Sequence, residues 1–354
     1  YLCSMKSLRI LLLPFSWLYG MVVFLRNFLF DVGLLKSRTI NIPVICIGNL
    51  NTGGTGKTPH TEYLLSALSN YKTAVVSRGY GRNTPGIAEV HVDSQPNDTG
   101  DEPLQIKRKF PIVPFIVSEK RSEGIDYLLK HYPNTEVILL DDAFQHRSVK
   151  AGMNILLTQY NDLFINDCLL PAGNLRESAS SASRADVIIV TKCPTAITVE
   201  QKKSIISQLP SKPVFFSSFS YDNLQSLNSD EKLNLRDLTE YEILLITGIA
   251  SNNSLLGFLS THSKKIKNIS FKDHHNYCAK DLENIIAIFN NLASEKKIIV
   301  VTEKDAVKFN SSELKPLTKN LPVYSIPVTV VINENEIKFL DTVKAYVGKN
   351  QSNS

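Results

Sequence analysis

The residues best suited to chemistry stand in a glycine-rich stretch that follows the apolar run Ile45-Cys46-Ile47. In phosphate-binding loops, glycines turn backbone N–H groups toward a polyphosphate, a lysine contributes a cation to the β- and γ-phosphates, and a hydroxyl binds Mg²⁺. The stretch therefore predicts a nucleoside triphosphate site with Mg²⁺. Its expected binding residues are Asn51, Thr52, Gly53, Gly54, Thr55, Gly56, Lys57 and Thr58.

Asn51 stands where the pattern G-x-x-x-x-G-K-[ST] has its first glycine. Asparagine is the residue that, after glycine, best tolerates positive φ. We expect Asn51 to adopt the turn conformation that a glycine would take. The alternative is a glycine-rich turn that binds no ligand.

Two carboxylates follow a second apolar run, Val137 to Leu140. Asp141 and Asp142 are placed to hold Mg²⁺ if this strand lies beside the strand that feeds the loop. Taken alone, the pattern marks only the end of a strand. The polar residues Gln145-His146-Arg147 come next and are expected either to orient phosphates or to cap a turn.

Three further segments carry candidate residues at the ends of expected strands or helices. Arg78, Tyr80 and Arg82 form a loop suited to an anionic substrate, or a solvated basic turn. Asp101 opens a helix and is by pattern an ordinary N-cap. His274 ends a strand, where a histidine is more often structural than catalytic.

These segments need an α/β scaffold, and the pattern of short Val/Ile/Leu runs between helical stretches predicts one. We expect a P-loop NTPase-like, mostly parallel sheet in residues 39–220. A polar stretch at residues 217–240 is the expected linker to a smaller α/β domain, residues 221–354, which includes a strand over 323–330.

Residues 1–38 are expected to form a membrane-associated helical segment. Ile10 to Leu25 contain no charged residue, yet this run is shorter than the roughly 20 residues that span a bilayer. A helix in the membrane interface fits best, because basic residues flank the run and aromatic residues are spread through it. A cleaved signal peptide and a buried core helix are the alternatives.

Composition excludes several other classes. A net charge of +5 over 354 residues is far below that of a nucleic-acid binder, although it suits an anionic membrane surface or a phosphorylated substrate. The five cysteines show no zinc spacing, which favours a reduced cytoplasmic setting.

Together these motifs resemble the tetraacyldisaccharide 4′-kinases, the lipid A 4′-kinases of Gram-negative bacteria. The resemblance covers nearly the whole chain in the family's order. It rests on Gly48-Asn49 with the Gly53–Pro59 loop, Ser77–Arg82, Gly100–Pro103, Leu140–His146, Leu170–Glu177, Asp273-His274 and Thr302–Asp305.

The resemblance implies transfer of the ATP γ-phosphoryl to the 4′-hydroxyl of a tetraacylated glucosamine disaccharide 1-phosphate at the cytoplasmic face of the inner membrane. It makes Lys57 the phosphate lysine and Thr58, Asp141 and Asp142 the Mg²⁺ site. Gln145 becomes a phosphate-site residue and Asp101 the base with His274 as partner. Asn174, Arg176 and Glu177 join Arg78, Tyr80 and Arg82 as expected substrate-binding residues.

We expect Asp101 and His274 to lie in different domains, so that catalysis needs domain closure. The expected partners are the acylated disaccharide lipid and the membrane surface, without nucleic acid or an obligate protein partner.

Three other functions remain as alternatives. A membrane-associated P-loop ATPase switch would carry a signature lysine where this chain has Thr52. Val190-Thr191-Lys192 resembles the start of the guanine-binding motif Asn/Thr-Lys-x-Asp of GTPases. This chain has Pro194 at the position of the aspartate, so ATP is the preferred nucleotide. A purely structural α/β protein would leave the paired motifs unexplained.

Overall fold

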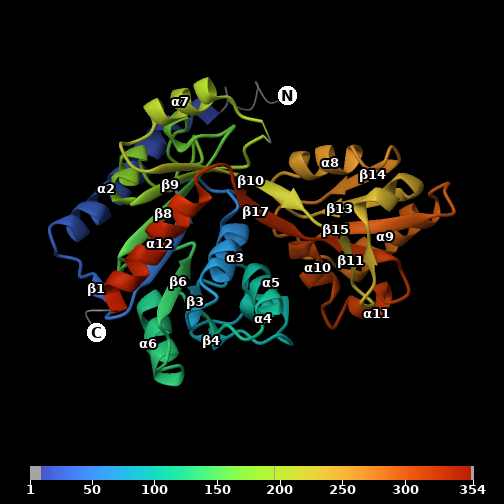
Figure 1. The fold of residues 1–354 in the computed structure, drawn as a ribbon, viewed down its shortest axis with the longest axis horizontal. Coiled ribbons are helices and arrows are strands. Elements are labelled where there is room, and N and C mark those ends of the chain that lie inside the picture. Colours follow the sequence, from blue (N-terminus) through green and yellow to red (C-terminus); the bar gives the residue numbers. More distant parts are fainter. Residues whose placement is uncertain (1–8, 195, 352–354) are drawn as a thin grey trace. The chain divides into compact units, whose positions relative to one another are not determined.

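The computed structural model describes residues 9–194 and 196–351 and divides into two compact units (Figure 1). The first unit contains the chain up to Arg78, Val113–Phe219 and the chain from Val330 on. The second contains Gly79–Ile112 and Ser220–Thr329. Lys6, Cys3 and the last residues of the polar tail lie outside the described residues.

The first sheet has the strand order β17-β10-β9-β8-β2-β6-β3-β5-β4. Neighbouring strands from β10 to β5 pair in parallel, as their continuous apolar runs predict. The strands are β2 (Val44–Asn49), β3 (Thr73–Ser77), β5 (Phe115–Val117), β6 (Val137–Asp141), β8 (Met153–Gln159), β9 (Val187–Thr191), β10 (Val214–Tyr221) and β17 (Val328–Ile332). A short parallel pair, β1 (Arg38–Thr39) and β7 (Val149–Lys150), lies apart from this sheet.

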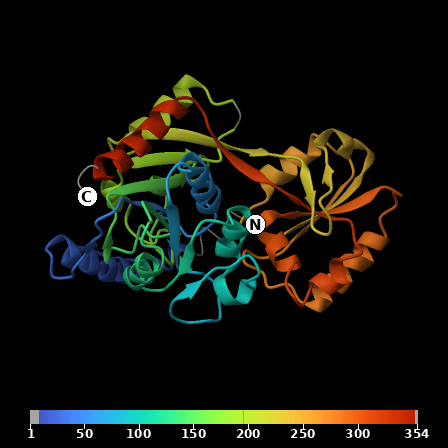
Figure 2. The ribbon, with the colours of Figure 1, turned by 60° about the horizontal axis from the view of Figure 1, so that its bottom comes forward.

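Helices cover both faces of this sheet. Figures 1 and 2 show α12 (Glu336–Gln351) on one side and α2 (Leu13–Asp31) on the other. The Tyr346 hydroxyl of α12 accepts a hydrogen bond from the backbone N–H of Val44 in β2 at 3.0 Å. The remaining helices are α3 (Lys57–Ala67), α6 (Arg121–His131), α7 (Val199–Gln208), η1 (Phe164–Asn166) and η2 (Ala179–Arg184).

The second unit has its own sheet, in the order β12-β11-β16-β15-β13-β14. Its central strands are parallel, and two hydrophobic clusters form its core. The strands are β4 (Ala88–Glu89), β11 (Leu224–Ser226), β12 (Lys232–Leu233), β13 (Glu242–Thr247), β14 (Ile266–Ser270), β15 (Lys297–Thr302) and β16 (Val323–Ile326), of which β4 is outside this sheet. The helices are α4 (Pro96–Thr99), α5 (Asp101–Lys109), α8 (Asn253–Ser260), α9 (Ala279–Asn290), α10 (Glu303–Phe309), α11 (Lys315–Thr318) and η3 (Leu235–Glu240).

The units differ from the expected domain boundaries in two places. Residues 79–112 belong to the second unit because α5 packs on α10, where Lys109 pairs with Glu303 at 3.1 Å. The strand expected over residues 323–330 is two strands, β16 in the second sheet and β17 in the first. After β17 the chain returns to the first unit and forms α12, which the sequence did not predict.

The N-terminal helix α2 attaches to the first unit through its few polar residues. The Ser16 hydroxyl donates to the carbonyl of Leu169 at 3.0 Å, and the Tyr19 hydroxyl donates to the carbonyl of Arg176 at 2.9 Å. Its apolar residues point outward, and Trp17 is 80% exposed. By length and composition, the helix could cross a membrane.

Candidate active site

The glycine-rich loop connects β2 to α3, as the sequence predicts. Gly53 and Gly56 have positive φ, 117° and 90°, which is the conformation that requires glycine. A Cβ at Gly56 would also lie 2.8 Å from Cζ of Phe219. Inside the loop, Asn49 Nδ2 donates to the Thr55 hydroxyl at 2.9 Å. The loop is therefore shaped by its glycines and held by Asn49.

Asn51 does not adopt the left-handed conformation that we expected, since it is not among the described non-glycine residues with positive φ. It forms an isolated β-bridge with Leu175, and the next N–H, that of Thr52, donates to the carbonyl of Asn174 at 2.7 Å. These bonds keep the start of the loop extended. The turn therefore begins at Gly53.

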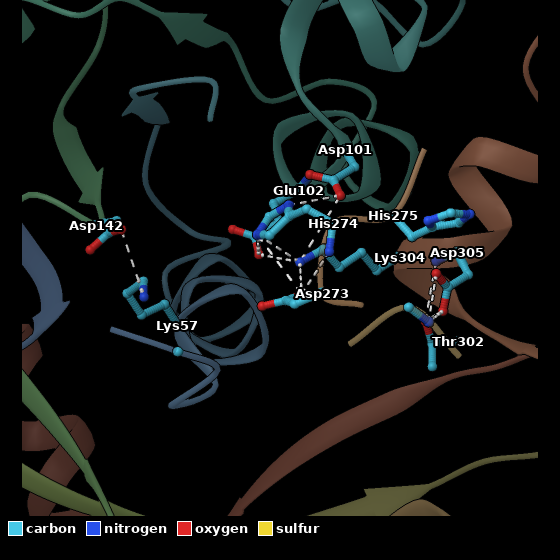
Figure 3. A network of polar contacts seen from close by, with 12 residues as sticks. Lys57, Asp101, Glu102, Asp142, Asp273, His274, His275, Thr302, Lys304 and Asp305 are labelled. Carbon is cyan, nitrogen blue, oxygen red and sulfur yellow. Dashed lines mark hydrogen bonds and ion pairs between the residues drawn. The ribbon is translucent and has the colours of Figure 1, made fainter. Parts of the chain in front are cut away.

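The two aspartates end β6, which pairs directly with β2 as predicted. The buried Asp141 accepts a hydrogen bond from the Thr61 hydroxyl of α3 at 3.0 Å. Asp142 follows with φ 48° and faces Lys57, whose Nζ lies 3.7 Å from Asp142 Oδ2 (Figure 3). Asp142 is thus the carboxylate that points toward the phosphate lysine.

A second cation also reaches Asp142. Arg176 donates to Asp142 Oδ1 at 2.8 Å and to the Asn49 carbonyl at 3.3 Å. Burial by itself would raise the pKa of Asp142, but Lys57, Arg176 and Arg121 outweigh it and hold that pKa well below its usual range. Asp142 is therefore an anion already matched to two cations that could also bind phosphate.

Gln145 and Asn51 each present a buried side-chain oxygen without a hydrogen-bond partner in the described structure. The other end of each side chain is anchored, because Gln145 Nε2 donates to the Asn49 carbonyl at 2.8 Å and Asn51 Nδ2 donates to Asp167 at 3.3 Å. A buried acceptor without a donor is costly. Such oxygens suit a cation, a water molecule or a donor group supplied by a ligand.

Residues 167–177 form a strap that connects α2 to the nucleotide loop. Asn174 contacts Thr52 through its carbonyl, while its side-chain oxygen accepts from Arg9 at 3.3 Å. Glu177 is fully buried, and its two oxygens pair with Arg26 and Arg184. These two ion pairs attach α2 to the strap, and the substrate-binding role expected of Glu177 stays a prediction.

The expected base and its partner occur together within the second unit. Asp101 Oδ2 lies 3.2 Å from Nδ1 of His274 (Figure 3). Asp101 is nearly buried, with 6% of its side chain exposed. Our expectation that the two residues lie in different domains is wrong, because α5 belongs to the second unit. The pair therefore forms without domain closure.

Two lysines of α10 complete this acidic cluster. Lys304 Nζ lies 3.0 Å from Glu102 Oε1, and Lys308 Nζ lies 3.1 Å from Asp101 Oδ2. Burial tends to raise the pKa of Asp101, but the hydrogen bond from His274 and the charges of both lysines lower it far below its usual range. Asp101 is consequently ionised at any pH near neutrality.

The basic loop after β3 is divided between the units. Arg78 is exposed and ends the first unit, while Tyr80 and Arg82 belong to the second. The Tyr80 ring packs edge-on against His274 with centroids 4.9 Å apart, and the Arg82 guanidinium donates to the Gly86 carbonyl. Tyr80 thus helps to orient the His274 ring.

Comparison with known proteins identifies the family of this chain. Residues 8–345 match the sequence model of the family described as Tetraacyldisaccharide-1-P 4′-kinase. The chain belongs to this family. A Tetraacyldisaccharide 4′-kinase of Bacteroides thetaiotaomicron is 46% identical over 97% of this chain and 94% of its own length. One from Flavobacterium johnsoniae is 43% identical over 91% of this chain and 93% of its own length.

A crystal structure of LpxK from Aquifex aeolicus in complex with ATP has the same fold. Its TM-score is 0.76 at 30% identity, with 96% of this chain and 99% of that chain covered. Family and fold confirm the predictions of a P-loop kinase fold and of a kinase enzyme.

The sequence did not predict the lysine and asparagine side chains that hold the predicted site residues in place. Asn49, Lys304 and Lys308 contact the key groups but match no catalytic pattern by themselves. One signal was available, since Thr302-Glu303-Lys304-Asp305 directly follows a predicted strand. A lysine four residues further along the helix, Lys308, shares the face of Lys304.

Proposed function

We propose that this chain transfers the γ-phosphoryl group of ATP to the 4′-hydroxyl of a tetraacylated glucosamine disaccharide 1-phosphate, a step in lipid A biosynthesis. The observation that carries the proposal is the buried Asp101 carboxylate, fixed by His274 at 3.2 Å. Phosphorylation of a sugar hydroxyl needs a positioned base, whereas an ATPase switch has no such acceptor. Membership of the family supplies the substrate class.

Separate residues serve the γ-phosphate and the sugar hydroxyl. Lys57 and Arg176 stabilise the charge that develops on the γ-phosphate, since both already surround the anionic Asp142. Asp101 accepts the proton of the sugar hydroxyl as its oxygen bonds to the γ-phosphorus, and ADP leaves with the electrons of the broken P–O bond.

The first unit also fits Mg²⁺. Thr58 and Asp142 offer the hydroxyl and carboxylate oxygens that this hard cation prefers, with Asp141 beside them. Gln145 Oε1 is a buried acceptor without a partner in the described part of the chain, so a further oxygen ligand is available. Bound there with ATP, the ion would neutralise phosphate charge.

The outward apolar face of α2 supports attachment to a membrane, where an acylated substrate is found. Only 17% of the apolar stretch of α2 is buried. We place the enzyme at the cytoplasmic face of the bacterial inner membrane, because its reaction uses ATP. Its partners are then the lipid substrate and the membrane surface.

The decisive experiment incubates the purified protein with ATP, Mg²⁺ and tetraacyl disaccharide 1-phosphate in detergent. Mass spectrometry should then show a second phosphate on the lipid, and Lys57→Ala should abolish the product. Nucleotide-dependent dimerisation without a lipid product would instead favour the ATPase switch.

Membrane attachment has a separate test with matched variants. Trp17→Ser on α2 should weaken flotation with anionic vesicles, while Ile337→Ser on α12 should leave it unchanged. Ile337 is a fair control because it is similarly exposed, at 77% compared with 80% for Trp17. Equal flotation of wild type and Trp17→Ser would contradict the assignment of this face.

A further inference from the structure

The second unit contains a pair of buried ammonium groups that the proposed reaction does not yet use. Lys304 and Lys308 lie one turn apart on α10 and face the same side. Their side chains are only 12% and 7% exposed. Buried lysines are rare unless paired, so their partners indicate what they do.

Lys304 contacts the ring nitrogen of His274 that faces away from Asp101. Its Nζ lies 3.1 Å from Nε2 of His274 and 3.1 Å from Oδ1 of Asp273. An ammonium group has three donors and no acceptor, so Nε2 must accept this hydrogen bond. The ring proton then sits on Nδ1, which donates to Asp101.

Lys308 binds the same Asp101 oxygen. Its Nζ lies 3.1 Å from Oδ2 and donates to the carbonyl of His275 at 2.9 Å. Oδ2 therefore faces both the His274 ring and an ammonium group, whereas Oδ1 accepts, among the residues that the structure describes, one backbone hydrogen bond, from the Glu102 N–H at 3.0 Å. Oδ1 is the oxygen with more capacity for a further donor.

We propose that Lys304 and Lys308 are positioning residues for the phosphoryl transfer, in which Lys304 fixes His274 as the neutral Nδ1–H tautomer and Lys308 holds Asp101 so that its Oδ1 receives the substrate proton. The proposal rests on the function proposed above. In the step itself, the sugar O–H bond breaks as the Oδ1–H and O–P bonds form, and His274 remains a donor throughout.

The arrangement also explains how a carboxylate of lowered pKa serves as base. Around Asp101 lie the charged groups Lys304, Lys308 and the adjacent Glu102, together with the His274 ring as a hydrogen-bond donor, and the two lysines keep the carboxylate ionised. In a loose transition state the hydroxyl loses its proton late, when it has become strongly acidic. A weak base in a fixed position is then sufficient.

The test measures the tautomer directly, without lipid substrate. Long-range ¹H–¹⁵N spectra of histidine-labelled full-length protein, with His274 assigned from the His274→Gln variant, should show the Nδ1–H form at the pH of the kinetic assay. A wild-type His274 present as Nε2–H or as imidazolium would overturn the proposal, whatever the lipid assay shows.

Kinetics give the second measurement. Lys304→Met should lower kcat by about 10- to 100-fold, part of the contribution of a positioned base, with the KM for ATP unchanged. The acidic limb of the pH–kcat profile of Lys304→Met should also move to higher pH, because a cation beside Asp101 is lost. Lys304→Arg should have a higher kcat than Lys304→Met. Lys319→Met, at an exposed lysine of the same unit, is the control. Unchanged kcat and pH profile in Lys304→Met would refute the role of Lys304.

Discussion

Replacing Glu177 by Gln distinguishes the substrate role predicted from the sequence from the structural role seen in the fold. Removing one partner of a buried ion pair typically costs about 3–5 kcal/mol. Here Arg26 and Arg184 remain 40% and 22% exposed and regain water contacts, so a loss of about 2–3 kcal/mol is expected. For a unit of this size, that corresponds to a fall in Tm of roughly 4–12 °C.

The assay combines thermal unfolding with lipid kinetics well below Tm. The KM for lipid should be unchanged, because Glu177 has no exposed surface. Glu123→Gln is the matched control: its pair with Lys120 at 2.8 Å is exposed, so its loss should leave Tm nearly unchanged. A Glu177→Gln protein with wild-type Tm and a raised lipid KM would refute the structural role.

Three more predictions follow from the loop and the base. Burial lowers the pKa of His60 to about 4, so the unfolded chain takes up a proton that the folded chain does not, and the free energy of unfolding should fall as pH drops from about 6.5 to about 4. Urea titrations at several pH values should show this slope reduced in His60→Gln. Gly56→Ala should raise the KM for ATP more than Gly53→Ala does, since only at Gly56 does a Cβ meet a neighbour within 4 Å; equal effects would contradict this. Asp101→Asn should lower kcat by about 10²- to 10⁴-fold at unchanged KM for ATP, measured as initial rates of lipid phosphorylation.

The phosphate loop and the paired aspartates were predictable because their chemistry depends on residues close together in the chain. Gly53, Gly56 and Lys57 act through one turn, and a strand ending in Asp141-Asp142 must pair beside β2 to be useful. Local spacing is visible in a single sequence. The fold class was predictable for the same reason, since parallel strands carry continuous apolar runs.

The surroundings of the base could not be predicted because its contacts join distant segments. Asp101 and Lys308 are far apart in sequence, and the packing of α5 on α10 brings them to 3.1 Å. The backbone conformation of Asn51 could not be predicted for the same reason. Its side-chain type permits a left-handed turn, but the β-bridge to Leu175 determines its actual backbone conformation. Tertiary contacts decided both cases.

Which side of α2 faces the protein could be determined only from the structure. An apolar stretch can be a core helix or a membrane helix, and its composition does not distinguish them. In the structure, Ser16 and Tyr19 bind the strap while Trp17 and Phe24 are exposed, so the polar residues face the protein. A core helix would show the opposite orientation. The same strap carries Arg176 to Asp142, so the helix that we assign to the membrane is attached through one short segment to the phosphate site.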